Sequence, residues 1–363
     1  MITKNDLIMK KVLSETPHKI VSVCDLASSK IECGKILNII ISRKCNKIFA
    51  DLVINPIIMF ELNDTDLEFD YTRIFNSICV MIGGILIDKL YQNQISIYLA
   101  NYDLQVVRDK QKVYFPVPIQ CMLNGIFGSK CEYHNINLLL EFSKNNIVNY
   151  IADIKIQSDL IFFQTQPNLT KVFLSAMFNH YEICELRLTQ QPKINYKKIL
   201  QDIKKNYVGR FTNTIYQNQS VTINNLLSMG GDFFVMNIYL FHMIKKIYLY
   251  FEEKNTNVIY KGKGFEHMKF IANKCNILNM SWDELVFESN LANPNLPKGI
   301  YQIEWKSEYN DVYKDKSLFY GDDLVVKLDE ICIPSSDINL IICAQSINSI
   351  LYVADMAGLE FYN

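Results

Sequence analysis

Short segments in which apolar and polar residues alternate are the feature that most constrains the fold of this chain. In Asn135–Phe142 the sequence NINLLLEF places Ile136, Leu138, Leu140 and Phe142 on one face. Alternation with a period of two is typical of a strand with one face buried in a core. Comparable segments occur at Ile247–Phe251, Leu324–Ile331 and Leu340–Val353. Both faces of the first are expected to be covered. The last is expected to form two strands that meet near Gln345–Asn348.

A pair of glycines predicts one hairpin. In Ile78–Asp88 (ICVMIGGILID) two apolar runs flank Gly83 and Gly84. Two glycines tolerate the positive φ angles that a tight two-residue turn requires. The alternative is a buried helix, but paired glycines inside a helix cost about 2 kcal/mol. The hairpin is therefore the favoured interpretation.

The sequence predicts only a few short helices. Tyr196–Tyr207 has its apolar residues at helical spacing. The serine and glutamate of Ser281–Glu284 have the spacing of a capping box, which predicts a helix from there to about Glu288. Leu169–Phe178 is a third candidate.

Length and composition predict two domains with large cores. The chain has 363 residues, of which 49% are apolar and 21% charged, and this composition argues against wholesale disorder. A break near Gln164–Asn168 and a polar stretch through Gln190–Pro192 indicate an interdomain connection. With a strand every 8–12 residues or so, each half can hold about eight strands. Two similar halves are compatible with a diverged duplication.

Charge and cysteine usage exclude several classes of protein. The formal net charge is -1 without a basic block, so bulk electrostatics give no reason to expect direct binding of nucleic acid. The ten cysteines are scattered without a C-x-x-C pair, which indicates free thiols in a reducing compartment and disfavours a zinc site. The sequence predicts neither a signal peptide nor a transmembrane helix.

The motifs of common enzymes are missing. The five histidines form no H-x-H or H-E-x-x-H pattern, and neither G-x-S-x-G nor the phosphate-binding G-x-x-x-x-G-K-[ST] occurs. Gly262-Lys263-Gly264 is more typical of a turn than of a phosphate cradle. These observations favour a structural or binding role without catalytic residues, cofactor or metal.

Three segments share an order of motifs with a known family. The first is Ser77–Tyr91, which carries I-G-G-x-x-I-D at Ile82, Gly83, Gly84, Ile87 and Asp88. The second is Tyr114–Phe142, which begins with Pro116 and Pro118 and ends in the run Y-H-x-I-x-L-x-L-E-F at Tyr133, His134, Ile136, Leu138, Leu140 and Phe142. The third is C-terminal and consists of a turn with Pro297 and Gly299 and an ending with Gly358, Leu359 and Asn363.

In this order the segments resemble the double jelly-roll major capsid proteins of nucleocytoplasmic large DNA viruses. The resemblance covers roughly Ile74–Phe142 and Phe233–Asn363, more than half of the chain. The chain departs from the family in Cys121–Lys130, where an unrelated loop replaces the run N-P-G-L-A-L-P, and at Lys298, where the family has serine. Ala354-Asp355 also departs from the usual residues, and the chain is compact for the family.

The resemblance implies an all-β fold of two tandem eight-stranded antiparallel jelly rolls with a few short helices in loops. The N-terminal jelly roll is expected in residues 1–165, and a linker plus the C-terminal jelly roll in residues 166–363. Gly83 and Gly84 are expected to turn a hairpin and Gly299 a loop. Tyr133, Ile136, Leu138, Leu140 and Phe142 are expected to fill the first core, and Gly358 and Leu359 to close the second jelly roll.

The resemblance also implies a structural role in a virus particle. Three copies are expected to form a pseudo-hexameric capsomer, and such trimers tile an icosahedral shell. The expected partners are the chain itself, neighbouring capsomers and minor capsid proteins, with contact to an internal viral membrane through partners. Neither direct nucleic-acid binding nor a small-molecule substrate is expected. The protein is expected in the virion, after assembly in a viral factory in the host cytoplasm.

Two kinds of alternative stay open. Within the same fold, the chain is compatible with a minor capsid paralogue or an assembly scaffold protein. Outside the viral context, a jelly roll can serve as a carbohydrate-binding module or a cupin-like metal protein. Only Trp282 and Trp305 could supply tryptophan to a sugar-binding platform, but the 21 tyrosines keep that alternative open. Glycan binding and metal analysis would distinguish these alternatives.

Overall fold

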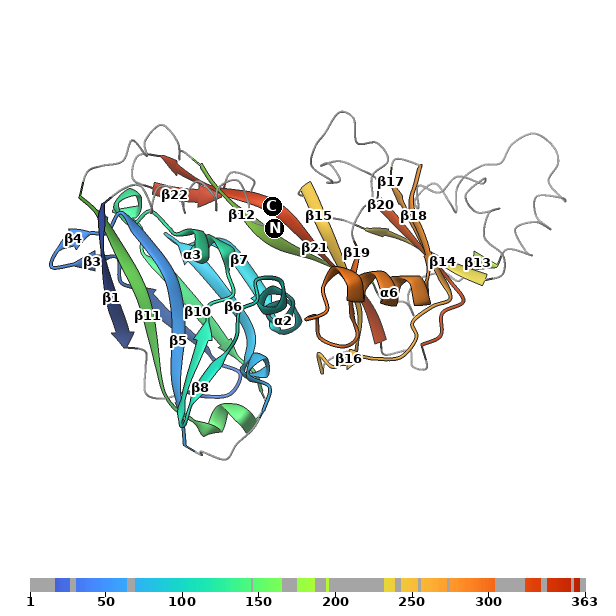
Figure 1. Cartoon of the computed structure of the whole chain (residues 1–363), viewed down its shortest axis with the longest axis horizontal. Helices are drawn as coiled ribbons and strands as arrows, with labels where there is room; N and C mark the ends of the chain where they lie inside the picture. Colours follow the sequence, from blue (N-terminus) through green and yellow to red (C-terminus); the bar gives the residue numbers. More distant parts are fainter. Residues whose placement is uncertain are drawn as a thin grey trace. The chain divides into compact units, whose positions relative to one another are not determined.

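The computed structural model describes two compact units (Figure 1). The first contains Met1–Tyr181 and Ile347–Asn363, and the second contains Glu182–Ser346. The described residues are 17–26, 31–63, 69–144, 146–164, 175–186, 194–195, 232–238, 243–253, 256–272, 275–303, 324–333, 338–353 and 356–359.

Two antiparallel sheets form the first unit. One sheet has the order β1-β11-β5-β9-β8, made of β1 (His18–Leu26), β11 (Ile151–Phe163), β5 (Leu52–Leu62), β9 (Lys112–Pro116) and β8 (Val107–Asp109). The other has the order β2-β10-β6-β7, made of β2 (Ile36–Ile41), β10 (Ile136–Phe142), β6 (Phe75–Ile82) and β7 (Ile85–Tyr91). Figure 1 labels β1, β11, β5 and β8 of the first sheet and β10, β6 and β7 of the second.

The core of the first unit lies between the two sheets. Phe75 on β6 packs with its ring centroid 5.3 Å from that of Phe115 on β9, so an aromatic contact joins one sheet to the other. The centroid of Phe142 on β10 lies 5.6 Å from that of Phe75. All three rings are buried. Aromatic pairs at such separations add stabilisation beyond the apolar area that they bury.

The strands of the second unit also form two sheets. The first has the order β12-β21-β15-β16, with β19 also pairing with β15, and consists of β12 (Ser175–Leu186), β21 (Ile338–Val353), β15 (Met243–Glu253), β16 (Ile259–Tyr260) and β19 (Ile300–Ile303). The second has the order β13-β14-β20-β17-β18 and consists of β13 (Ile194–Asn195), β14 (Asp232–Ile238), β20 (Leu324–Asp329), β17 (His267–Ala272) and β18 (Cys275–Ser281). The chain passes from unit to unit within β12 and β21.

The core of the second unit contains an aromatic cluster. The rings of Phe251, Phe265 and Trp282 contact one another, with centroids 5.0 Å apart for Phe265 and Trp282. Tyr248 and Tyr250, which point to the opposite side of β15, are buried as well. The expectation that both faces of this strand are covered is therefore confirmed.

The same strand arrangement occurs twice along the chain. In chain order the long strands are β1, β2, β5, β6, β7, β9, β10 and β11 in one set and β12, β14, β15, β17, β18, β19, β20 and β21 in the other. In each set the first, eighth, third and sixth strands share one sheet, and the second, seventh, fourth and fifth share the other. Each set also has a helix between its fifth and sixth strands, namely α2 (Gln92–Asn101) and α6 (Trp282–Ala292).

The remaining elements are short. They are β3 (Lys44–Cys45), β4 (Ile48–Phe49), β22 (Met356–Leu359), α3 (Gln120–Asn124) and the 3-10 helices Tyr71–Ile74, Ser129–Cys131 and Asn146–Tyr150. In the described part of the chain, no helix combines the length and the apolar character needed to span a membrane.

The all-β prediction is confirmed, and the structure corrects it in three places. Ile338–Val353 is one continuous strand where two were expected, because its backbone pairs through the polar segment at Gln345–Asn348. Ser175–Phe178, part of the third expected helix, lies in β12, while its other residues are outside the described ranges. The helix α2 was not predicted. The helix expected at Tyr196–Tyr207 lies outside the described residues.

The assignment of the C-terminal residues to a domain differs between the sequence expectation and the structure. The boundary expected between residues 165 and 166 falls in a segment that the structure does not describe, and it stays a prediction. Residues 347–363 were expected in the second domain but group with the first unit. The reason is the length of β21, since a strand of 16 residues spans about 50 Å and can carry the chain from one unit to the other.

Candidate functional site

The hairpin between β6 and β7 has a turn that depends on its glycines. Gly83 and Gly84 have φ angles of 60° and 87°, and two positive φ angles are what a two-residue primed turn requires. Ile82 pairs with Ile85 at the end of the ladder. Ile82 and Ile87 are buried. The predicted hairpin is present.

Asp88 lies next to this turn in β7. Its side chain is 1% exposed, and its Oδ1 accepts a hydrogen bond of 2.9 Å from the backbone N–H of Lys89. A buried carboxylate is costly without such a donor. The carboxylate therefore binds local backbone, which fits the structural role that the sequence suggested for it.

The Y-H strand begins later than the sequence suggested. The ladder of β10 starts at Ile136, and its core-facing side chains are Ile136, Leu138, Leu140 and Phe142, all 2% exposed or less. Tyr133 precedes the strand and is 75% exposed. The expectation that Tyr133 fills the first core is therefore wrong. Residues before the first ladder pair are not held to the alternation of the strand.

His134 connects the loop before β10 to the glycine hairpin. Its backbone N–H donates to the carbonyl of Cys131 at 3.0 Å, and the N–H of Gly83 donates to the carbonyl of Asn135 at 3.1 Å. The imidazole ring lies against Gly83, where a Cβ would come within 2.5 Å of ring atoms. The loop at residues 131–135 and the hairpin turn therefore pack as one unit.

Arg43 holds the same loop from another side. Its Nη1 donates to the carbonyl of Cys131, and its Nη2 donates to the carbonyl of Glu132 at 3.2 Å and to Oδ1 of Asn135 at 3.4 Å. Partial burial lowers the pKa of the Arg43 guanidinium, while Cys131 and Glu132 act in the opposite direction and raise it. Arg43 lies about 90 positions earlier in the chain, so no local pattern could have identified it.

The two prolines of the second motif lie at the end of β9. Pro116 is the last residue of the strand and pairs with Ile57 on β5. The N–H of Val117 then donates to the carbonyl of Pro56 at 3.0 Å, which extends the contact by one residue. Pro118 follows and is buried. Proline lacks an N–H and is compatible with a strand end rather than its interior.

The C-terminal motifs lie in two places. Gly299, with φ of 95°, turns the chain into β19, and the N–H of Ile300 donates to the carbonyl of Pro297 at 3.1 Å. Gly358 and Leu359 lie in β22 and pair with Leu351 and Ile350. They were expected to close the second jelly roll. Their strand β22 pairs with β21 of the six-stranded sheet, while the segment groups with the first unit, and the expectation stays a prediction. Asn363 lies outside the described residues.

The end of β21 is anchored in the first unit by a tyrosine. The hydroxyl of Tyr352 accepts a hydrogen bond of 3.4 Å from the N–H of Phe127, and the two rings meet edge to face with centroids 5.2 Å apart. Tyr352 is 5% exposed, and this burial raises the pKa of its phenol well above the usual value.

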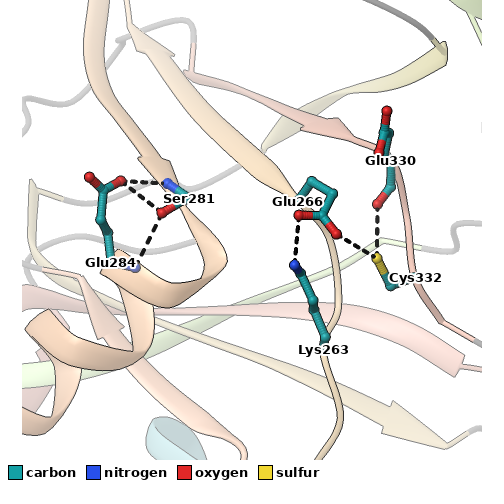
Figure 2. A network of polar contacts seen from close by, with 6 residues as sticks. All are labelled: Lys263, Glu266, Ser281, Glu284, Glu330 and Cys332. Atoms are coloured by element: carbon teal, nitrogen blue, oxygen red, sulfur yellow. Dashed lines mark hydrogen bonds and ion pairs between the residues drawn. The ribbon is translucent and has the colours of Figure 1, made fainter.

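A polar network in the second unit holds a loop between two strands (Figure 2). Glu266 forms an ion pair of 2.6 Å with Lys263, and its other oxygen lies 3.8 Å from the thiol of Cys332. The N–H of Cys332 donates to the carbonyl of Gly264 at 2.9 Å, and its thiol donates to the carbonyl of Glu330 at 3.2 Å. These groups are paired with one another, so the arrangement positions a loop rather than a substrate.

A capping box lies beside this network at the start of α6 (Figure 2). The N–H of Ser281 donates to Oε2 of Glu284 at 2.7 Å, and the N–H of Glu284 donates to Oγ of Ser281 at 3.3 Å. Reciprocal bonds of this kind satisfy two backbone donors at a helix start. The predicted cap is confirmed, and the helix continues to Ala292 rather than ending near Glu288.

Comparisons with known proteins reveal the fold through structure rather than through sequence. The chain matches no protein-family profile and no curated protein sequence. Among solved structures, PBCV-1 VP54 fitted into a reconstruction of the virophage Sputnik is 12% identical, with a TM-score of 0.65, and the match covers 96% of this chain and 98% of that one. The fold is the double jelly roll of viral major capsid proteins.

Further structures agree with this fold. The quasi-atomic model of the PBCV-1 virus capsid is 13% identical, with a TM-score of 0.62 and coverage of 96% and 98% of the two chains. The Faustovirus major capsid protein is 7% identical, with a TM-score of 0.56 and coverage of 93% and 91%. The resemblance detected in the sequence is thereby confirmed at the level of the fold, and the two repeated sets of strands are the two jelly rolls.

The second jelly roll also contains an unusual buried lysine that the sequence did not reveal. Lys327 on β20 is 0% exposed, and no described residue accepts a hydrogen bond from its Nζ. It lies opposite Lys269 on β17 in the ladder. Burial, together with the charge of Lys269, lowers the pKa of Lys327 to about 8. In the described ranges, no group of three or more His, Cys, Asp or Glu residues could hold a metal ion.

Proposed function

We propose that the protein is a structural subunit of a viral capsid. Three copies form a capsomer with a pseudo-hexagonal outline, and these trimers tile an icosahedral shell. The observation that carries the proposal is the structural likeness to PBCV-1 VP54, which covers 96% of this chain and 98% of that chain. Because the likeness spans both jelly rolls, it supports the use of the pair as one building block.

The physical properties of the fold suit this role. The long strands β5, β11, β15 and β21 are paired on both sides, which keeps their backbone groups from uncontrolled association. Cyclic symmetry closes a trimer, while weaker contacts between trimers can extend over a shell. The role is structural and not enzymatic, and it requires no cofactor.

The proposed partners and location follow from the same role. The chain contacts other copies of itself, neighbouring capsomers and minor capsid proteins, and it reaches an internal viral membrane only through such partners. It resides in the virion after assembly in a viral factory in the host cytoplasm.

The experiment that tests the proposal is a measurement of mass in solution by light scattering on the purified protein. The expected result is a stable species near three times 42.3 kDa. A strict monomer at concentrations well above micromolar would contradict the trimeric capsomer. Quantifying the protein in mature particles then separates a shell component, which is abundant there, from an assembly scaffold, which is absent.

A further inference from the structure

Strand β2 leaves one edge of its sheet unpaired. In the order β2-β10-β6-β7 its only neighbour is β10, and no described residue pairs with its other side. The N–H of Phe142 donates to the carbonyl of Lys35 at 3.0 Å, so these two residues form a hydrogen-bonded pair. Hydrogen-bonded and non-hydrogen-bonded pairs alternate along an antiparallel ladder. Ile36, Asn38 and Ile40, the outward residues of β2, therefore direct their N–H and C=O groups away from β10.

The other side of β10 supports this assignment. The N–H of Gly83 donates to the carbonyl of Asn135 at 3.1 Å, which makes them a hydrogen-bonded pair at the end of β6 and β10. By the same alternation, every second residue of β10 from Asn137 onwards bonds to β6. These are the residues that lie opposite the outward residues of β2. Their backbone groups are engaged with β6, so they cannot serve β2.

The side chains of the outward residues lie on the solvent face of the sheet. Ile36 is 64% exposed and Ile40 is 55% exposed, whereas Ile39 between them is 3% exposed. Asn38 is exposed as well, and its Oδ1 accepts a hydrogen bond of 3.0 Å from Nδ2 of Asn137. The edge of β2 thus combines unpaired backbone groups with two exposed isoleucines on either side of a side chain that is held in place.

This edge also lacks the charged residues that protect the other edges of the first unit. Charged side chains on an edge strand, lysine above all, prevent it from pairing with other chains. The sequence of β2 is ILNIII, without a charge. The other edge strands β1, β7 and β8 contain the basic residues Lys19, Lys89 and Arg108. An unprotected edge is a template to which a further strand can be added.

The outward residues of β2 are self-complementary about Asn38. When two copies of β2 pair antiparallel with Asn38 at the centre, Ile36 of each copy lies opposite Ile40 of the other. All outward N–H and C=O groups then have a partner, because the residues of a hydrogen-bonded pair exchange both bonds. A register shifted by two residues leaves some of these groups unpaired. The centred register also forms two cross-strand isoleucine pairs, which stabilise a sheet.

We propose that β2 pairs with β2 of a second copy of this chain across a two-fold axis at Asn38. The four-stranded sheets of the two copies become one continuous sheet. Such a contact uses the same surface on both copies and is complete with two of them. A three-fold ring contains no two-fold axis, so in the proposed capsid this contact joins subunits of two neighbouring capsomers.

Cysteine cross-linking tests the register. In the variant Asn38→Cys, the two introduced thiols meet at the axis on Cα atoms about 5.5 Å apart, as in a hydrogen-bonded ladder pair, and a disulfide can span this separation. In Ile36→Cys the two Cα atoms are offset by four residues and lie about 13 Å apart or more. With oxidised glutathione as the oxidant, Asn38→Cys should form covalent dimers at least about tenfold faster than Ile36→Cys.

The wild-type protein is the control for the natural thiols. Cys24 and Cys332 are exposed, and peptide mass spectrometry separates their products from a disulfide through residue 38. Equal rates of dimer formation for Asn38→Cys and Ile36→Cys would overturn the proposed register. The absence of any disulfide through residue 38 would overturn the contact.

Charge substitutions test the same contact without oxidation. Ile36→Lys/Ile40→Lys puts like charges opposite each other in both isoleucine pairs, and it should raise the dissociation constant of the two-fold contact, measured by sedimentation, at least about tenfold. Ile36→Glu/Ile40→Lys puts opposite charges in both pairs and should restore association. Both positions are exposed, so the fold should tolerate either change. Equal dissociation constants for the two variants would contradict the pairing.

A matched control changes exposed apolar residues of other strands. Ile48→Lys/Val107→Lys alters side chains that are 64% and 56% exposed, and it should leave the dissociation constant of the two-fold contact unchanged. A protein that forms trimers but no dimer through residue 38 keeps the capsomer and overturns this contact. Cross-linking through residue 38 without any trimer supports this contact and contradicts the capsomer.

Discussion

The imidazole of His134 lies directly on Gly83. A Cβ added to this glycine would come within 2.5 Å of both Cγ and Nδ1 of the ring, a separation that real Cβ atoms essentially never show. Gly83 also has a positive φ of 60°, which side chains of L-residues rarely adopt. The hairpin turn and the loop before β10 can approach this closely only because the turn residue has no side chain.

Replacing Gly83 by alanine should therefore destabilise the protein by about 2 kcal/mol or more, through strain at positive φ and the clash with His134. The measurement is chemical unfolding followed by fluorescence. Gly84→Ala is the matched control, since φ at Gly84 is also positive but nothing lies within 4 Å of its added Cβ. Adding His134→Ala to Gly83→Ala should recover part of the lost stability, because the clash with the imidazole ring is removed. Equal destabilisation by Gly83→Ala and Gly84→Ala would show that the contact with His134 does not matter.

Arg43 should stabilise the loop at residues 131–135. The variant Arg43→Ala removes three hydrogen bonds to this loop, and it should cost about 2 kcal/mol because the donor is charged. Hydrogen exchange should show the loss concentrated in residues 131–135. Lys44→Ala is the control: it removes the contact of Lys44 Nζ with the ring of Phe49, 3.8 Å from the centroid, but no bond to this loop, and it should leave exchange in residues 131–135 unchanged. Unaltered exchange in Arg43→Ala would contradict the anchoring role.

Lys327 should make the second jelly roll less stable at neutral pH than at alkaline pH. Its pKa is lowered to about 8 from 10.5, so the unfolded chain binds the proton more tightly. The loss of folding stability that the buried charged amine causes is complete below about pH 8, and it disappears as the pH rises towards 10.5. Lys327→Met should raise the free energy of unfolding at pH 7 by on the order of 2 kcal/mol. It should also make that free energy depend less on pH between pH 8 and 10.5.

The measurement for Lys327 is a series of unfolding curves from pH 7 to pH 10.5. Lys269→Met is the informative companion, since Lys269 is the neighbour whose charge lowers the pKa of Lys327. That variant should reduce the pH dependence without removing it. Identical pH profiles for wild type and Lys327→Met would show that the buried amine does not titrate in this range.

Glu141 should contribute to resistance to acid. Its carboxylate accepts hydrogen bonds from Oγ of Ser77 at 2.6 Å and from Nδ2 of Asn76 at 2.8 Å. The Ser77 hydroxyl is the main cause that lowers the pKa of Glu141 below 4.5. The stabilisation is therefore present above about pH 4.5 and is lost as the pH falls through the lower folded pKa. Glu141→Gln should weaken this acid dependence in unfolding curves between pH 3 and 6, whereas an unchanged curve would argue against it.

The capping box should stabilise α6. Ser281→Ala removes the acceptor for the N–H of Glu284 and should cost about 1 kcal/mol. Asn290→Ala, at an exposed position within the same helix, is the control and should be neutral or slightly stabilising. The measurement is thermal unfolding of the two variants. Equal midpoints would show that the capping box does not contribute to the stability of the protein.

The parts of the fold that depend on neighbouring residues could be predicted from the sequence. The glycine hairpin, the strand at Ile136–Phe142 and the cap of α6 each follow from a few consecutive residues. Tyr133 was misplaced because alternation does not show where the ladder of a strand begins. Helix α2 was missed because the acceptor at its start is Gln94, and its buried polar residues obscure an apolar stripe.

Features that join distant residues could not be predicted. The hydrogen bonds of Arg43 to the loop at residues 131–135, the pairing of Lys327 opposite Lys269, and the contact of Phe127 with Tyr352 all link segments far apart in the chain. The same holds for the correspondence of α2 with α6, which appears only when the strand order of both jelly rolls is known.

The return of residues 347–363 to the first unit sets an order on biosynthesis. A ribosome makes the rest of the first unit, then all of the second, and only then the segment that contains Tyr352 and β22. The contact of Phe127 with Tyr352 within the first unit therefore forms only after translation has passed through the second unit. A prematurely terminated chain lacks Tyr352 and thus leaves the N–H of Phe127 without this acceptor.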